Sequence, residues 1–290
     1  MTKRTKEEID AWLNDLYLEC IQKGIPHKQR ELEVRSKIDD FLKVWSIKPI
    51  PEKEYAIKWI KSQCKQGSDL LPISIFAFYY DTEFWEIKIP RIYGSVKITP
   101  LESLINMPST LMRYLSYNYY PDMEEYVHHW ANCFDLEYGS KEISSIHLDH
   151  NAFAANFLFS GIQNLNAATA ALLYTSHNNQ TIMSIRLSLE MFIKSYIAFN
   201  DHSKKTYEEK DKQARKLGHD LEKGLEKIQQ ISPDKINKNL FEIIKLFPNI
   251  NDRYIPQTMN IIDIASCYTL TVHLGAMVTR SITDRNILNQ

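Results

Sequence analysis

The chain has 290 residues, of which 44% are hydrophobic and 24% are charged, values that exclude a disordered polypeptide and predict a packed core. Its 35 lysine and arginine residues are balanced by 36 acidic residues. Bulk attraction to nucleic acid or to an anionic membrane is therefore excluded, and any such binding must come from a local patch.

Apolar periodicity predicts three helices near the start of the chain, over residues 7–23, 32–45 and 52–65. The segments "PISIFAFYYD", "EFWEIKIP" and "GSVKI" are rich in β-branched and aromatic residues and predict two or three short strands. After Pro100 the pattern is helical again in "LESLINMPSTLMRYL", with a break at Pro108, and in "PDMEEYVHHWANCFDL".

From about residue 150 onward the pattern is entirely helical, with helices predicted over residues 151–174, 181–199, 219–231, 237–247 and 257–283. The polar interval at 200–214 is expected to be a mobile loop. We therefore predict a mainly α protein with two domains. Residues 1–148 form an α+β part with a small sheet, and residues 149–290 form an antiparallel helical bundle.

Several segments bear on location and chemistry. The charged start lacks the apolar region of a secretion signal, and no apolar run reaches the roughly 18 residues of a membrane span. The four cysteines are far apart, as is typical of reduced thiols, so a cytoplasmic protein without membrane contact is expected. No glycine-rich phosphate loop or nucleophile elbow is present, which argues against the commonest nucleotide hydrolases and α/β-hydrolases.

Three short motifs occur in order in the C-terminal half: "SLEMFIKSYIAF" with Glu190 and Lys194, "GHDLEKGL" with His219, and "DRYIP" with Arg253 and Tyr254. In this order and spacing, residues 151–282 resemble the HEPN family (higher eukaryotes and prokaryotes nucleotide-binding domain). No family is recognised for residues 1–150.

The resemblance implies a helical bundle that forms a homodimer and binds a nucleotide or RNA. It also implies that Glu190, Lys194, His219, Arg253 and Tyr254 contribute to a phosphate-binding site. Many members of the family are metal-independent ribonucleases with an arginine followed, after four to six residues, by a histidine. If Arg253 is that arginine, the corresponding positions hold Thr258, Met259 and Asn260, so the nuclease signature is not intact.

The stretch "RKLGHDLEKGL" contains an alternative pair, Arg215 and His219, which are the candidate catalytic residues. In one continuous helix both would lie opposite the leucine stripe, where histidine exchanges protons near neutral pH and arginine clamps a phosphate. Alternatively Gly218 interrupts the helix. His219 would then lie in a first helical turn, beside free backbone N–H groups, and Arg215 would belong to a loop.

Three further sets of residues have competing interpretations. Arg186, Glu190 and Lys194 stand four apart and form either an exposed charge ladder or part of a cleft. Arg253 either neutralises a phosphate or ties a loop to a helix end. The set His128, His129, Cys133, His147, Asp149 and His150 contains zinc-ligand types, but the spacings match no zinc motif, so we expect no metal.

The function predicted from the sequence is binding of a nucleotide or of RNA phosphates around His219, without a cofactor. The N-terminal part would recognise a target or a protein partner. One alternative is a metal-independent endoribonuclease of toxin or phage-defence type, with His219 as general acid/base and Arg215 or Arg253 stabilising the transition state. The other alternative is a non-catalytic dimerisation scaffold, in which the apolar stripe from Ile261 to Ile282 would mediate self-association.

Overall fold

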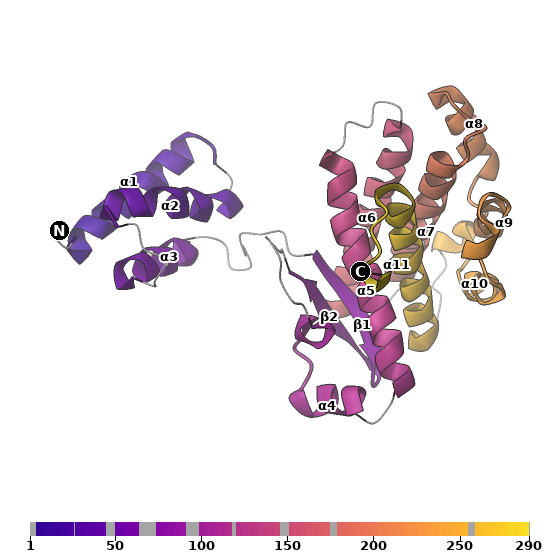
Figure 1. Cartoon of the computed structure of the whole chain (residues 1–290), viewed down its shortest axis with the longest axis horizontal. Helices are drawn as coiled ribbons and strands as arrows, with labels where there is room; N and C mark the ends of the chain where they lie inside the picture. Colours follow the sequence, from indigo (N-terminus) through magenta and orange to yellow (C-terminus); the bar gives the residue numbers. More distant parts are fainter. Residues whose placement is uncertain are drawn as a thin grey trace. The chain divides into compact units, whose positions relative to one another are not determined.

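The computed structural model describes residues 4–25, 27–44, 50–63, 74–90, 99–117, 120–145, 151–174, 179–254 and 259–289. The chain divides into two compact units, Met1–Ile73 and Ser74–Gln290 (Figure 1). The described part is mainly α-helical and contains one small antiparallel sheet, as predicted.

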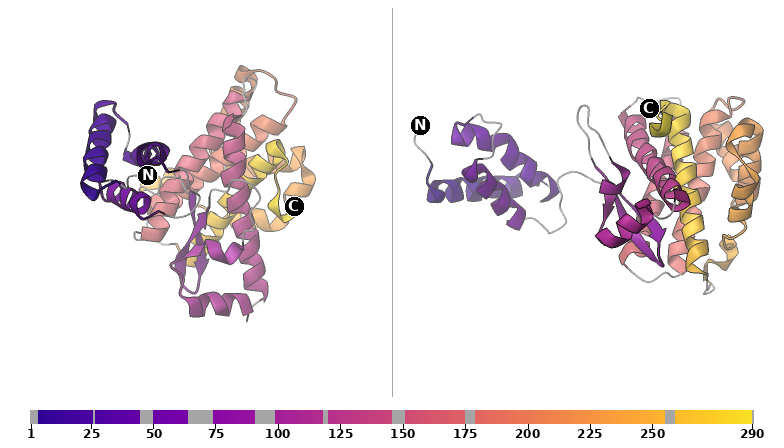
Figure 2. Two further views of the ribbon diagram at one scale, coloured as in Figure 1. Left: turned by 60° about the vertical axis from the view of Figure 1, so that its left-hand side comes forward. Right: turned by 60° about the horizontal axis from the view of Figure 1, so that its bottom comes forward.

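The described residues of the first unit form three helices, α1 (Lys6–Gln22), α2 (His27–Leu42) and α3 (Pro51–Gln63) (Figure 2). Thr5 and Glu8 form a capping box that satisfies backbone N–H groups at the start of α1. The apolar stripes of the three helices meet in one small core, made of Ile9, Leu13, Leu16, Val34, Ile38, Ala56 and Ile60. The helices predicted here are thus confirmed to within a few residues.

The second unit begins with the sheet, whose strands β1 (Ser74–Tyr80), β2 (Glu83–Ile89) and β3 (Leu104–Ile105) lie in the order β1-β2-β3. Asp81 and Thr82 both have positive φ, as expected for the tight turn of a two-residue hairpin. β3 is not the segment "GSVKI", which lies outside the described residues. It falls in a region predicted to be helical, between a 3-10 helix (Pro100–Ser103) and α4 (Ser109–Tyr117).

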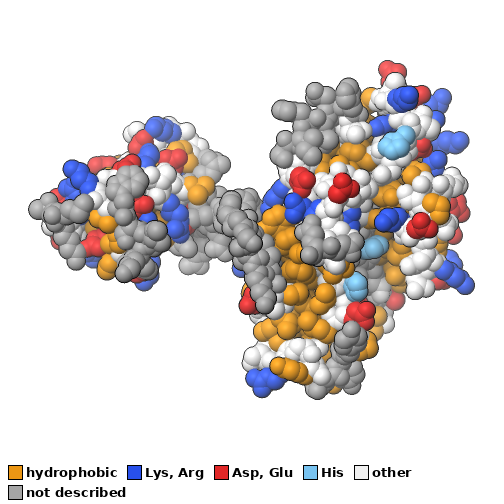
Figure 3. All heavy atoms as spheres, in the orientation of Figure 1, with side chains coloured by type: hydrophobic (Ala, Val, Ile, Leu, Met, Phe, Trp, Pro, Cys, Tyr) orange, Lys and Arg blue, Asp and Glu red, His pale blue; other side chains and the backbone are white. Residues whose placement is uncertain are grey.

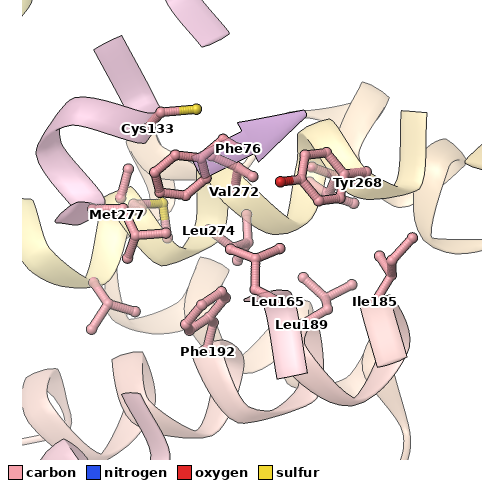
Figure 4. Packing of buried hydrophobic residues seen from close by; sticks show 14 of the residues in the cluster. Phe76, Cys133, Leu165, Ile185, Leu189, Phe192, Tyr268, Val272, Leu274 and Met277 are labelled. Atoms are coloured by element: carbon pink, nitrogen blue, oxygen red, sulfur yellow. The ribbon is translucent and has the colours of Figure 1, made fainter. Parts of the chain in front are cut away.

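Four long helices form the body of this unit: α5 (Tyr120–Ser145), α6 (Ala152–Tyr174), α7 (Asn179–Asn200) and α11 (Ile261–Thr283). Their shared core is shown in Figure 4, where Phe192 of α7 lies among side chains of the neighbouring helices. Gly161 of α6 and Gly275 of α11 both approach the Phe192 ring. A Cβ atom at either glycine would lie within 3 Å of a ring carbon. The two glycines therefore allow α6 and α11 to pack closely against α7.

The free edge of β1 is covered by helix side chains. The backbone N–H of Ala77 donates to the Tyr268 hydroxyl at 3.1 Å, and Nε2 of His129 lies 2.9 Å from the Ala77 carbonyl. Tyr268 in turn hydrogen-bonds Thr169 at 2.7 Å. These bonds satisfy buried backbone groups that would otherwise lack a partner. They also join β1 to α5, α6 and α11.

The boundary between the units differs from the predicted one at residues 148–149, which falls inside the second unit. The reason is a single hydrophobic core that includes Phe76 of β1 and Trp130 of α5 together with residues of the later helices. The sheet and α5 are thus part of the same unit as the bundle.

The expectation of a mobile loop over 200–214 is wrong from residue 207 onward, because α8 (Tyr207–Leu217) occupies that segment. Thr206 and Glu209 form a capping box, and Ala214 is buried. α9 (Leu221–Ile231) and α10 (Lys238–Ile244) follow, and the three short helices flank α7 and α11 (Figure 1).

The apolar stripe of α11 is buried inside its own unit, with Ile264, Tyr268 and Val272 at 4% exposure or less. It is therefore not the free surface from which self-association was expected. Among the described helices, α11 is the one whose length and composition would allow it to cross a membrane. Core helices of soluble proteins meet the same criterion, and 61% of its most apolar window is buried.

Candidate functional site

Three charged residues of α7, Arg186, Glu190 and Lys194, lie one turn apart on the side of the helix that faces the α8–α9 connection. Nζ of Lys194 donates to Oε1 of Glu190 at 2.7 Å, and the two side chains are only 11% and 4% exposed. An exposed charge ladder is therefore the wrong interpretation. The carboxylate of Glu190 is a buried charge that needs its cationic partners.

His219 provides the second partner of Glu190. Its Nδ1 lies 3.0 Å from both carboxylate oxygens, although its side chain is 60% exposed. Because an ionised carboxylate only accepts hydrogen bonds, Nδ1 carries the proton. In the neutral ring Nε2 is then an acceptor, and it has no partner in the described part of the chain. Glu190 thus orients an imidazole whose free nitrogen faces outward.

Arg186 is buried, with 5% of its surface exposed. Nη2 donates to the backbone carbonyl of His219 at 2.7 Å, whereas Nε and Nη1 have no partner among the described residues. Burial lowers the pKa of the guanidinium from its ordinary value, and the carboxylates of Glu190 and Asp220 oppose that shift. Two strong donors therefore remain unused within the described part of the chain, which is an unusual state for buried polar groups.

An open pocket of about 420 Å³ lies over this arrangement. Its walls come from α7, from the start of α9 and from the segment after α10: Arg186, His219, Asp220, Leu221, Glu222, Ile244, Lys245, Phe247, Pro248, Asn249 and Ile250. Asp220 at the rim is compensated, because its carboxylate accepts from the backbone N–H of Lys223 and pairs with Nζ of that lysine at 2.9 Å.

The turn that delivers His219 to α7 depends on Gly218. Its φ of 60° and ψ of −128° form a combination that glycine adopts readily and other residues do not. α8 ends at Leu217, and Asp220 is the N-cap of α9. Gly224, one turn into α9, has Ile193 of α7 so close that a Cβ would lie 2.5 Å from a methyl carbon. This close packing holds the turn against α7.

Both sequence interpretations of "RKLGHDLEKGL" need correction. The helix is interrupted at Gly218, but His219 precedes the N-cap and is not in the first turn of α9. Arg215 lies in the last turn of α8 and not in a loop, with a side chain 81% exposed and paired with Asp211 at 2.8 Å. Arg215 does not line the pocket. The arginine that meets His219 is Arg186.

The remaining candidates fall into two groups. The backbone of Arg253 and Tyr254 belongs to a 3-10 turn (Ile250–Tyr254), but their side chains lie outside the described residues. His129 and Cys133 are buried, and burial lowers the pKa of His129 to about 4. His147, Asp149 and His150 lie outside the described residues. Elsewhere in the described chain, no group of three metal-ligating residues is positioned to hold an ion.

Sequence reasoning placed Arg186 beside Glu190 and Lys194 but did not include it among the site residues. It also missed the wall formed by residues 244–250. No local sequence pattern identifies Arg186 or this wall as part of the site. The partner of Arg186 is a backbone carbonyl 33 residues away, and the wall comes from the end of α10 and the segment after it. No family model matches the chain, and no curated protein or solved structure matches it.

Proposed function

We propose that the pocket over Arg186 and His219 binds the phosphate groups of a nucleotide or of RNA. The observation that carries this proposal is the buried Arg186 guanidinium, with two N–H donors unpaired among the described residues. A guanidinium presents its donors in a planar fork that fits phosphate oxygens, and burial strengthens such bonds. A bound phosphate would give these two donors the acceptors that they lack within the described chain.

His219 supports the same proposal. Its ring is exposed at the pocket and oriented by Glu190, and upon protonation Nε2 becomes a second donor to the ligand. Lys245 also lies in the pocket wall, where Nζ pairs with Glu242 at 3.0 Å and is a further donor that a ligand could reach.

The test is calorimetric titration of the full chain with ATP and ADP. Arg186→Lys keeps the charge but removes the fork, so affinity should fall about tenfold or more. Arg215→Lys is the matched control, since the same change is made on an exposed side chain outside the pocket. Equal affinities for wild type and Arg186→Lys would refute the proposal.

A specific observation favours an endoribonuclease as the second candidate. The Glu190–His219 pair leaves Nε2 free to take the proton of a ribose 2′-hydroxyl. The 2′-oxygen then attacks the phosphorus, and the P–O5′ bond breaks as the 5′-oxygen takes a proton from water. Arg186 would stabilise the added charge on the phosphate in this scheme. Incubation of labelled RNA in EDTA tests it: cleavage by wild type that His219→Ala abolishes supports catalysis, and intact RNA refutes it.

Homodimer formation belongs to the same proposal, because the resemblance to the HEPN family implies it. Recognition of a target or a protein partner by the N-terminal part, residues 1–148, stays a prediction. With the α11 stripe buried, the dimer would have to use another surface. Light scattering that gives the 34.0 kDa of a single chain at all concentrations would refute the dimer.

A further inference from the structure

A second depression lies beside the α8–α9 turn and is separate from the Arg186 pocket. It is a groove of about 650 Å³ between the facing sides of α8 and α9. Its lining residues are Lys204, Glu209, Lys212, Gln213, Lys216, Leu217, Lys223, Glu226, Lys227 and Gln230. Figure 3 shows basic side chains over α8 and α9, with acidic side chains among them.

The charge of this lysine groove is positive although the whole chain is nearly neutral. Its five lysines face two glutamates. Lys223 pairs with Asp220, and Lys227 pairs with Asp201. Neither aspartate lines the groove. The other three, Lys204, Lys212 and Lys216, have no carboxylate within ion-pair distance in the described chain. Several cations of the groove are thus available to an external anion.

Four of the five lysines are arranged in two rows. Lys212 and Lys216 are one turn apart on α8, and Lys223 and Lys227 are one turn apart on α9. A separation of four residues corresponds to a rise of roughly 6 Å along a helix. That rise is close to the separation of neighbouring phosphates on a nucleic acid strand. Each row therefore matches a repeating phosphate chain better than a single anion.

The lining also indicates how the ligand is held. It offers one apolar side chain, Leu217, and no aromatic ring among the described residues. A peptide partner would need apolar anchors, and base recognition would need stacking platforms or directed hydrogen bonds. Lysine acts on phosphate as a point charge and carries no base information. The chemistry is therefore that of backbone binding without sequence preference.

We infer that the lysine groove binds the sugar–phosphate backbone of a single nucleic acid strand, and that the strand continues around the α8–α9 turn to the Arg186 pocket. The continuation of the strand to the Arg186 pocket rests on the proposed function. The groove would then select a polynucleotide over a mononucleotide for the pocket. The turn residues from Leu217 to Lys223 border both depressions, so one chain can reach both.

The experiment measures binding of a fluorescent oligouridine to the full chain by anisotropy, over a series of NaCl concentrations. The variant Lys212→Gln/Lys216→Gln should bind about fivefold or more weakly at low salt. Its plot of log K against log salt should be shallower by roughly 1.4, since each phosphate contact on a single strand contributes about 0.7. Lys235→Gln/Lys238→Gln is the control, with the same charge change on exposed lysines outside the groove.

Unchanged oligouridine affinity and salt slope in the groove variant would overturn the inference. It would also be overturned if polyglutamate displaced the oligouridine as strongly as unlabelled RNA of equal charge does. Failure of the proposed function gives a different result. In that case ADP binding is absent or indifferent to Arg186→Lys, while the strand still depends on the lysines. Support for both requires that Arg186→Lys weakens ADP and RNA, and that the groove variant weakens RNA alone.

Discussion

Nδ1 of His219 lies 3.0 Å from both carboxylate oxygens of Glu190, although the two residues are 29 positions apart in the chain. The same carboxylate accepts from Lys194 at 2.7 Å. A buried anion thus holds one cation inside the protein and one imidazole at its surface. The predictions for these residues follow from that difference in exposure.

Replacement of His219 with alanine should weaken nucleotide binding and leave the fold intact. The ring is mostly exposed, and Glu190 keeps Lys194 as its partner, so stability should change by about 1 kcal/mol or less. Melting temperature and ADP affinity measured on the same variant check this. His202→Ala, at an exposed site outside the pocket, serves as control. A large loss of stability with unchanged affinity would make His219 a structural residue.

Replacement of Glu190 with glutamine should be far more damaging. It leaves the ammonium group of Lys194, which is 11% exposed, without its counter-charge, and removal of one partner of a buried pair costs about 3–5 kcal/mol. Urea unfolding of Glu190→Gln and of Glu190→Gln/Lys194→Met checks the cause. The second variant should recover part of the loss. If both unfold at the same urea concentration, the buried charge is not responsible.

Stability should fall as the pH is lowered from about 6.5 to 4. Burial lowers the pKa of both His129 and His273 to about 4, so the unfolded chain binds more protons in this window. The stability that these two neutral histidines contribute is complete above the pKa of histidine in the unfolded chain, and it is lost as the pH falls through the window. For His129 alone it amounts to about 3 kcal/mol. Burial raises the pKa of Asp135, which opposes the trend near its lower end. Urea midpoints at pH 7 and 4.5 test this, and equal midpoints would contradict it.

Gly275→Ala should destabilise the second unit by about 1–3 kcal/mol, because the added methyl group would lie 2.9 Å from the Phe192 ring. Phe192→Leu removes the ring and creates a cavity of its own, so the double variant should be more stable than the sum of the two single effects predicts. Denaturant unfolding of the three variants measures this coupling. If the two changes in unfolding free energy simply add in the double variant, contact with the Phe192 ring is not the reason that position 275 needs glycine.

A fragment that begins at Ser74 should fold cooperatively, whereas one that begins at Ser145 should not. The longer fragment contains the complete core cluster. The shorter one lacks β1 and α5, so Tyr268 loses the Ala77 backbone and the α11 stripe becomes exposed. Thermal unfolding by circular dichroism distinguishes them. A cooperative transition for the shorter fragment would restore a domain boundary near residue 148.

The long helices could be predicted from the sequence alone, because a 3.6-residue apolar period is a local property of the chain. The stripes of α1, α6, α7 and α11 specify helices of nearly the predicted lengths. The helix α8 was missed because it is polar, although Thr206 and Glu209 carry a capping-box signal. Glu190, Lys194 and His219 were also singled out from short motifs, and the structure brings these three together.

Which charged groups contact one another could not be predicted from the sequence, because it depends on the folded arrangement of the helices. Arg215 is closer to His219 in sequence, yet Arg186 contacts it, because the Gly218 turn and the close packing of Gly224 on Ile193 bring the start of α9 onto α7. The domain boundary has the same origin. β1 belongs with the bundle because its edge groups find buried partners in α5 and α11. Contacts over such distances depend on how helices pack, and no local periodicity encodes that.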